Sequence, residues 1–161
     1  MKTHVNTVIA TCILAGGVLP FASTASQADG GSVSILSTNT LTSGSRAIDY
    51  HPMLIIECKT GAQPVLSQSI RIRDSVAGSG TIDIAVRADG GGDVSEQWSL
   101  ASNNRSFSTE GDRVAKRLSA KRLRFSWRIG LFSGRGEAIF DLTGSGDALT
   151  ALAAKCGSGQ S

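Results

Sequence analysis

The chain of 161 residues has few prolines, few aromatic residues and no long apolar segment after its first 21 residues. It contains 3 prolines, and aromatic residues make up 5% of the sequence. A membrane-spanning helix needs about 20 consecutive apolar residues, which argues against a polytopic membrane protein. The apolar content of 40% argues equally against disorder. Because the 19 glycines favour turns, we predict one globular domain with few long helices.

Residues that usually carry catalysis or bind metals are scarce as well. After the N-terminal segment the one histidine is His51, beside Asp49, and no G-x-S-x-G sequence marks a serine nucleophile. No phosphate-binding G-x-x-x-x-G-K-[ST] sequence is present. One histidine is too few for a typical zinc site, and Asp89 and Asp93 offer fewer oxygens than a calcium loop. We therefore expect no enzyme activity, no metal and no cofactor, with a hydrolase that uses His51 as the least favoured alternative.

The N-terminal segment has the organisation of a secretory signal peptide. Lys2 opens it, the largely apolar stretch 5–21 follows, and mostly small residues occupy 22–28. Signal peptidase requires small side chains at positions −3 and −1. Positions 26 and 28 satisfy this requirement, as do positions 23 and 25, and we favour cleavage after Ala28 over cleavage after Ala25. We expect residues 1–28 to be removed and the protein to be periplasmic or secreted; the alternative is an uncleaved N-terminal anchor.

Removal of this segment would leave two of the 3 cysteines, Cys58 and Cys156. Export to an oxidising compartment makes a disulfide between them the expected state. The bond would close a loop over most of the domain, which is worth about 4–5 kcal/mol in the chain-entropy model. The alternative is two separate buried thiols.

Alternation of apolar and polar residues runs through the middle and the end of the chain. It covers 65–73, 81–88, 123–131 and 136–142, and an apolar run at 53–58 precedes it. This pattern is typical of half-buried antiparallel strands. We expect weaker strands at 96–100 and 105–109. The Ser/Thr/Gly-rich stretch 29–51 is expected to be a lead-in, in which only 32–36 has strand character.

Two segments have helical patterns. In 111–120, Val114 and Leu118 lie four residues apart. In 145–156, Ser145 suits a cap, and the apolar residues up to Cys156 share one helix face. Because Cys58 ends the first buried strand, the disulfide would tie the last helix to the sheet.

These elements predict a mainly β (β-rich α+β) fold. We expect an antiparallel β-sandwich or curved sheet with two short helices and one disulfide. The domain would span 52–157, followed by a frayed tail at 158–161.

The segments 123–131 and 136–142 are expected to pair as a hairpin, because Ser133-Gly134 suits a tight turn. A turn centred there places Trp127 opposite Phe140 and brings the apolar faces of both strands together. The same register places Asp141 opposite Ser126.

Seven basic residues and no acidic ones lie between positions 113 and 128. Guanidinium groups suit carboxylates and phosphates, so this run is a candidate contact with an acidic partner. The alternative is a solvated face that neighbouring acids partly neutralise. Nucleic acid is disfavoured, because the net charge after removal of Lys2 is +2 and base-stacking aromatics do not accompany the basic residues. The candidate binding residues are Arg117, Lys121, Arg122, Arg124 and Arg128.

The order of these segments is similar to that of a known family. The sequence has a P-x-L-x-I-x-C strand at 52–58, an R-x-D segment at 87–89, an F-D-L-x-G segment at 140–144 and a closing helix that ends in Cys156-Gly157. Over roughly residues 52–157 it resembles the type VI secretion-associated accessory proteins of the VasI/TagO kind. The resemblance implies an exported accessory or binding protein and supplies no catalytic residues.

Two functions follow as expectations. The first is an exported, non-enzymatic accessory protein of the bacterial cell envelope. Its partner would be an envelope or secretion-apparatus protein, or an anionic envelope polymer. The second is a secreted inhibitor of a host or rival hydrolase, a lysozyme or a protease, in which the Gly-rich loop 89–93 plugs an active site. The sequence leaves the oligomeric state open.

Overall fold

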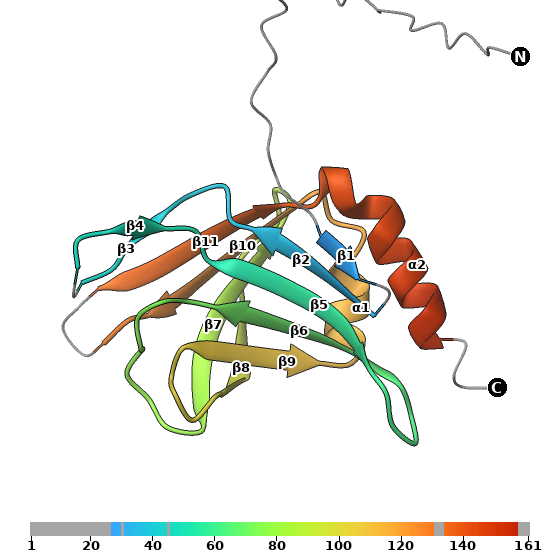
Figure 1. Cartoon of the computed structure of the whole chain (residues 1–161), viewed down its shortest axis with the longest axis horizontal. Helices are drawn as coiled ribbons and strands as arrows, with labels where there is room; N and C mark the ends of the chain where they lie inside the picture. Colours follow the sequence, from blue (N-terminus) through green and yellow to red (C-terminus); the bar gives the residue numbers. More distant parts are fainter. Residues whose placement is uncertain (1–26, 30, 45, 131–133, 158–161) are drawn as a thin grey trace, which may run out of the picture.

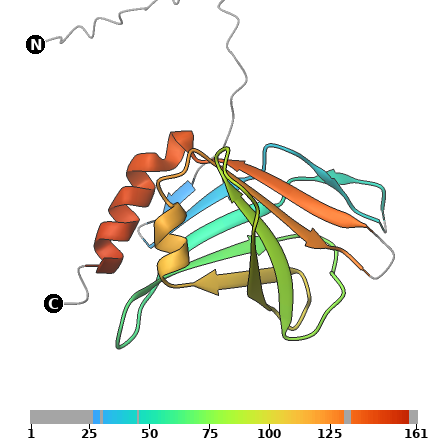
Figure 2. The same cartoon turned by 180° about the vertical axis from the view of Figure 1, so that it is seen from behind.

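The computed structural model describes residues 27–29, 31–44, 46–130 and 134–157. Within this part of the chain the mainly β prediction is confirmed, because strands dominate and two α-helices accompany them (Figures 1 and 2). The helices are α1 (Asp112–Arg117), the short 3-10 helix η1 (Thr143–Ser145) and α2 (Gly146–Gly157). The strands are β1 (Gln27–Asp29), β2 (Ser32–Leu36), β3 (Leu41–Thr42), β4 (Asp49–Tyr50), β5 (Met53–Lys59), β6 (Val65–Arg71), β7 (Thr81–Ala88), β8 (Val94–Leu100), β9 (Ser106–Glu110), β10 (Arg122–Arg128) and β11 (Arg135–Asp141).

The main sheet of the described residues has nine antiparallel strands and curls into a nearly closed barrel. Its strand order is β1-β2-β5-β6-β9-β8-β7-β10-β11. The segment after β2 then reaches β11: the Thr38 amide donates to the Ile139 carbonyl at 2.7 Å. The Asn39 side chain donates to the Glu137 carbonyl and accepts from the Ile139 amide, both at 2.8 Å. These bonds satisfy part of the edge that β11 would otherwise expose.

The barrel interior is filled by the apolar faces that the alternating pattern predicts. Aromatic rings form its centre, with Phe107 and Trp127 at 5.0 Å between centroids and Trp98 and Phe125 at 5.5 Å. Phe140 packs against Phe125 at 5.8 Å. All five rings are almost wholly buried, so the strands form a rigid frame for the side chains on the outer face.

The predicted register of the β10–β11 hairpin is wrong. Trp127 lies opposite Gly136, four positions from the expected Phe140, and Asp141 lies opposite Arg122, not Ser126. The apolar faces still meet, because a shift of four residues preserves the alternation. A Cβ atom at Gly136 would lie 2.7 Å from the Trp127 indole, so only glycine accommodates this ring. The turn expected at Ser133-Gly134 falls partly outside the described residues; the described pairing ends at Arg128 and Arg135, and the Ile129 amide donates to the Gly134 carbonyl at 3.1 Å.

The stretch 29–51, expected to be a lead-in, supplies the strand β2 to the main sheet and the separate two-stranded sheet of β3 and β4. Val33 and Ile35 of β2 are buried, and β2 pairs with β5 along its whole length. The hairpin of β3 and β4 follows. Apart from its last residues, the expected signal peptide lies outside the described residues, as does the tail 158–161. Ala28, the favoured cleavage position, lies within β1 opposite Val33, so cleavage there would divide β1 and cleavage after Ala25 would leave it whole.

Helices α1 and α2 lie at one end of the barrel, and the β3–β4 hairpin lies at the other (Figures 1 and 2). Helix α2 packs on β5, β2 and β6, and Ser145, the expected cap, ends the 3-10 turn that leads into it. The predicted disulfide between Cys58 and Cys156 is confirmed, with 5.5 Å between the Cα atoms. It ties α2 to the end of β5. Among the described residues, no helix has both the length and the apolar character to cross a membrane.

Candidate functional site

The outward face of β7, β10 and β11 gathers charged side chains; we call it the arginine face. Because side chains alternate along a strand, the residues that flank Leu123, Phe125 and Trp127 point away from the core. The predicted row of three β10 arginines on one face is therefore present. The charged residues of the face are Asp83, Arg87, Arg122, Arg124, Arg128, Arg135, Glu137 and Asp141.

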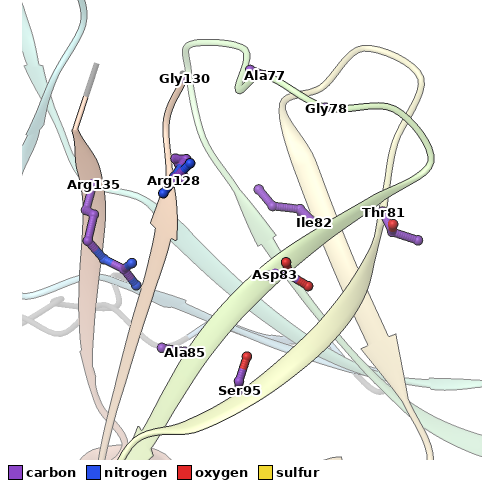
Figure 3. Close-up of a pocket in the computed structure, with 10 residues that line it drawn as sticks. All are labelled: Ala77, Gly78, Thr81, Ile82, Asp83, Ala85, Ser95, Arg128, Gly130 and Arg135. Carbon is purple, nitrogen blue, oxygen red and sulfur yellow. The ribbon is translucent and has the colours of Figure 1, made fainter. Parts of the chain in front are cut away.

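A hollow of about 570 Å³ lies on this face, and we call it the outer hollow. Figure 3 shows its charged side chains, which come from three neighbouring strands: Asp83 from β7, Arg128 from β10 and Arg135 from β11. Ala85 and Ser95 contribute only short side chains. The hollow exists because small residues lie between long charged ones.

Arg128 and Arg135 are direct cross-strand partners. Residues in such positions have Cβ atoms about 5 Å apart, and like charges there repel. Arg135 donates to the Ser126 hydroxyl at 2.9 Å. Among the described residues no carboxylate forms an ion pair with either arginine, and the Arg128 side chain has no hydrogen-bond partner. The hollow therefore presents two guanidinium groups against one carboxylate, that of Asp83.

Elsewhere on the arginine face, two arginines form ion pairs with carboxylates of neighbouring residues. Arg124 forms an ion pair with Glu137, with its Nε 2.7 Å from a carboxylate oxygen, and this hydrogen bonding raises the pKa of the Arg124 guanidinium. Arg87 pairs with Asp93 at 2.8 Å, and this hydrogen bond lowers the pKa of Asp93. Arg124 is thus partly engaged, whereas Arg128 keeps its charge available.

Of the five predicted site residues Arg128 alone lines the outer hollow; Arg122 and Arg124 lie elsewhere on the arginine face, and Arg117 and Lys121 lie outside it. Arg117 is 6% exposed and points inward, where its Nη2 lies 2.8 Å from both carboxylate oxygens of Glu96. Its guanidinium carbon lies 5.9 Å from the centre of the Trp98 ring. Arg117 therefore holds α1 against the barrel. Lys121 is exposed, and its backbone amide donates to the Asp89 carboxylate at 2.9 Å.

Arg135 and Asp83 are the residues that sequence reasoning missed. The predicted register put Ile139 opposite Arg128, so Arg135 was not counted with the arginine row. The structure pairs Arg135 with Arg128. Asp83 carried a usable signal, because it falls on the polar positions of the alternating segment 81–88.

The remaining candidates are engaged within the chain. His51 is exposed, and its Nδ1 lies 2.7 Å from the Ser37 carbonyl oxygen. In loop 89–93 the Asp89 carboxylate accepts the amides of Lys121 and Arg122 at 2.9 and 3.0 Å. Within the described ranges no group of three or more His, Cys, Asp or Glu side chains is placed to hold a metal ion.

Comparisons with protein-family models, with curated proteins and with solved structures found no match for this chain. The geometry of the arginine face is therefore the basis on which a function is proposed.

Proposed function

We propose that this chain is an exported, non-enzymatic accessory protein of the bacterial cell envelope, of the VasI/TagO kind, that binds an acidic partner through the arginine face. The contact centres on Arg128 and Arg135 in the outer hollow. The partner is an envelope or secretion-apparatus protein, or an anionic envelope polymer.

The observation that supports this proposal most strongly is the cross-strand pair of Arg128 and Arg135. Neither arginine has an ion-pair partner among the described residues. An arginine pair in this position repels itself, and a bound anion removes the repulsion. Two guanidinium forks can each donate two parallel hydrogen bonds to a carboxylate or a phosphate. Asp83 in the same hollow then accepts from a hydroxyl or ammonium group of the partner, which gives selectivity beyond charge.

The residues of the outer hollow suit binding better than catalysis. Among the described residues that line it there is no histidine and no thiol, so none of them pairs a nucleophile with a base in the usual way. The charged groups stand on paired strands and not on loops, and a fixed arrangement loses little entropy when a partner binds. The Cys58–Cys156 disulfide is typical of proteins that work in an oxidising compartment.

The test compares the full chain with two charge-matched variants in binding to peptidoglycan, lipopolysaccharide and envelope proteins. One carries Arg128→Ala and Arg135→Ala. The control carries Arg113→Ala and Lys116→Ala, which are exposed on α1. We expect the first variant to bind at least about tenfold more weakly at 50 mM salt, because charge-assisted bonds are lost, and the control to change little. Equal losses in both variants, or binding that high salt does not weaken, would contradict the proposal.

A second candidate, inhibition of a hydrolase by loop 89–93, is favoured by the way this loop is held. Asp89 is bonded to two backbone amides and Asp93 to Arg87, so the loop is preorganised. Next to it Val94 is 59% exposed. A panel of lysozymes and proteases tests this function; an Asp89→Ala variant is expected to inhibit more weakly, and a panel unaffected at micromolar protein would dispose of it.

A further inference from the structure

A second hollow, of about 620 Å³, lies at the end of the barrel opposite the helices. We call it the mouth pocket. The β3–β4 hairpin lies at this end of the barrel (Figure 1), and its residues Leu41, Thr42 and Tyr50 line the pocket. Its apolar lining comes from both sides: Ile72, Val76 and Trp127 are buried, and Leu41 and Ile129 are half-buried. The volume lies in the range of pockets that bind small molecules, which often occupy the mouths of β-barrels.

The mouth pocket continues into a smaller polar hollow of about 380 Å³. Arg105 and Asp74 line both hollows, and Arg46 and Arg73 complete the polar one. Three arginines thus face one carboxylate at the rim of an apolar pocket.

The one carboxylate at the rim, that of Asp74, already accepts hydrogen bonds from other residues of the chain. Asp74 accepts from the Ser43 hydroxyl at 3.0 Å and from the Gly44 amide at 2.8 Å, and so holds the β3–β4 hairpin over the mouth. The guanidinium of Arg73 lies 5.3 Å from the centre of the Tyr50 ring. Among the described residues, the side chains of Arg46 and Arg105 form no hydrogen bond or ion pair. The rim therefore keeps positive charge next to the apolar lining.

We infer that the mouth pocket binds a small amphipathic carboxylate with one acyl chain, its chain against Trp127 and its carboxylate at Arg105 and Arg46. An apolar cavity alone would accept any apolar ligand. The arginine rim selects an anion, since guanidinium groups donate strong hydrogen bonds to a carboxylate. Asp74 disfavours a second negative charge. This inference does not depend on the arginine face. The two sites share β10, but Trp127 points inward to the mouth pocket, whereas Arg128 lies on the outward face and is not among the pocket's lining residues.

The experiment measures binding of decanoate, decanol and decyltrimethylammonium to the full chain with its disulfide intact, by calorimetry below the micellar range. The three probes share the apolar chain and differ in charge. We expect saturable binding of decanoate, about tenfold weaker binding of decanol, and weaker binding still of the cation. Similar binding of all three probes, or no saturable binding of decanoate up to millimolar concentration, would overturn the inference.

Variants locate the site. Arg105→Ala is expected to weaken decanoate about tenfold and to leave decanol unchanged. Thr42→Phe, at an exposed position on the rim, is expected to weaken both probes by blocking the entrance. Arg113→Ala on α1, at the other end of the barrel, is the matched control. Unchanged decanoate binding in Arg105→Ala and Thr42→Phe variants that retain the wild-type thermal midpoint would place the ligand elsewhere and overturn the inference.

Discussion

Arg117 and Arg128 come from the same basic run, yet the fold gives them opposite surroundings. The Arg117 guanidinium lies inside the barrel end against both oxygens of Glu96, whereas Arg128 is exposed and lies opposite another arginine. A charge that is buried with its partner contributes to holding the fold. An exposed charge opposite a like charge stays available to a ligand. The number of basic residues in a segment therefore says little about how many of them can bind.

Removal of the buried charge is the strongest way to test this contrast. We expect Arg117→Met to destabilise the chain by about 3–5 kcal/mol, because Glu96 would remain buried without its cation. Urea unfolding with the disulfide intact measures the effect. Arg113 lies on the same helix and is exposed. We expect Arg113→Met to change the free energy of unfolding by no more than about 0.5 kcal/mol. Adding Glu96→Gln to Arg117→Met should restore much of the loss; no restoration would mean that packing, not charge, holds α1.

The interior of the barrel also contains the side-chain amide of Gln68. It is wholly buried, and neither its oxygen nor its nitrogen has a hydrogen-bond partner among the described residues. Unpaired buried polar groups destabilise a fold by about 1–3 kcal/mol. We expect Gln68→Met, which has a similar volume, to raise the free energy of unfolding by about 1–2 kcal/mol. A loss of stability in the same urea experiment would show that the amide is satisfied in solution.

The exposed arginines are expected to matter least for the fold. Arg128→Ala and Arg135→Ala should each keep stability within about 0.5 kcal/mol of wild type, with a slight gain from relief of repulsion. Thermal unfolding checks this result. A large loss in either variant would mean that the outer hollow is a structural feature, and the contrast with Arg117 would disappear.

The smallest expected effect concerns pH. Arg87 lowers the pKa of Asp93 in the folded chain, so the folded pKa lies below the unfolded value of about 3.9. The pair therefore stabilises the fold above that value and loses its effect as the pH falls through the folded pKa. We expect Arg87→Gln to be slightly less stable than wild type at pH 7 and equal to it near pH 2. A difference that persists at low pH would assign another role to Arg87.

The sequence predicted β2, β5–β11, both helices and the disulfide, because each rests on local patterns or on a pair of cysteines, but it did not predict the short strands β1, β3 and β4. It missed what depends on distant contacts. The register of β10 and β11 follows from the fit of the Trp127 indole over Gly136, which alternation cannot reveal. That error also hid Arg135 from the candidate site. Arg117 lies three residues after the buried Val114, and this helical spacing was the one available sign that it points inward.

The disulfide also sets an order of events. Cys58 lies near the end of an early strand, and its partner follows 98 residues later. Since the disulfide cannot form before Cys156 has been synthesised, the Cys58 thiol stays open to other partners until then. A product truncated between Cys58 and Cys156 lacks the native partner of that thiol, which marks it chemically as unfinished.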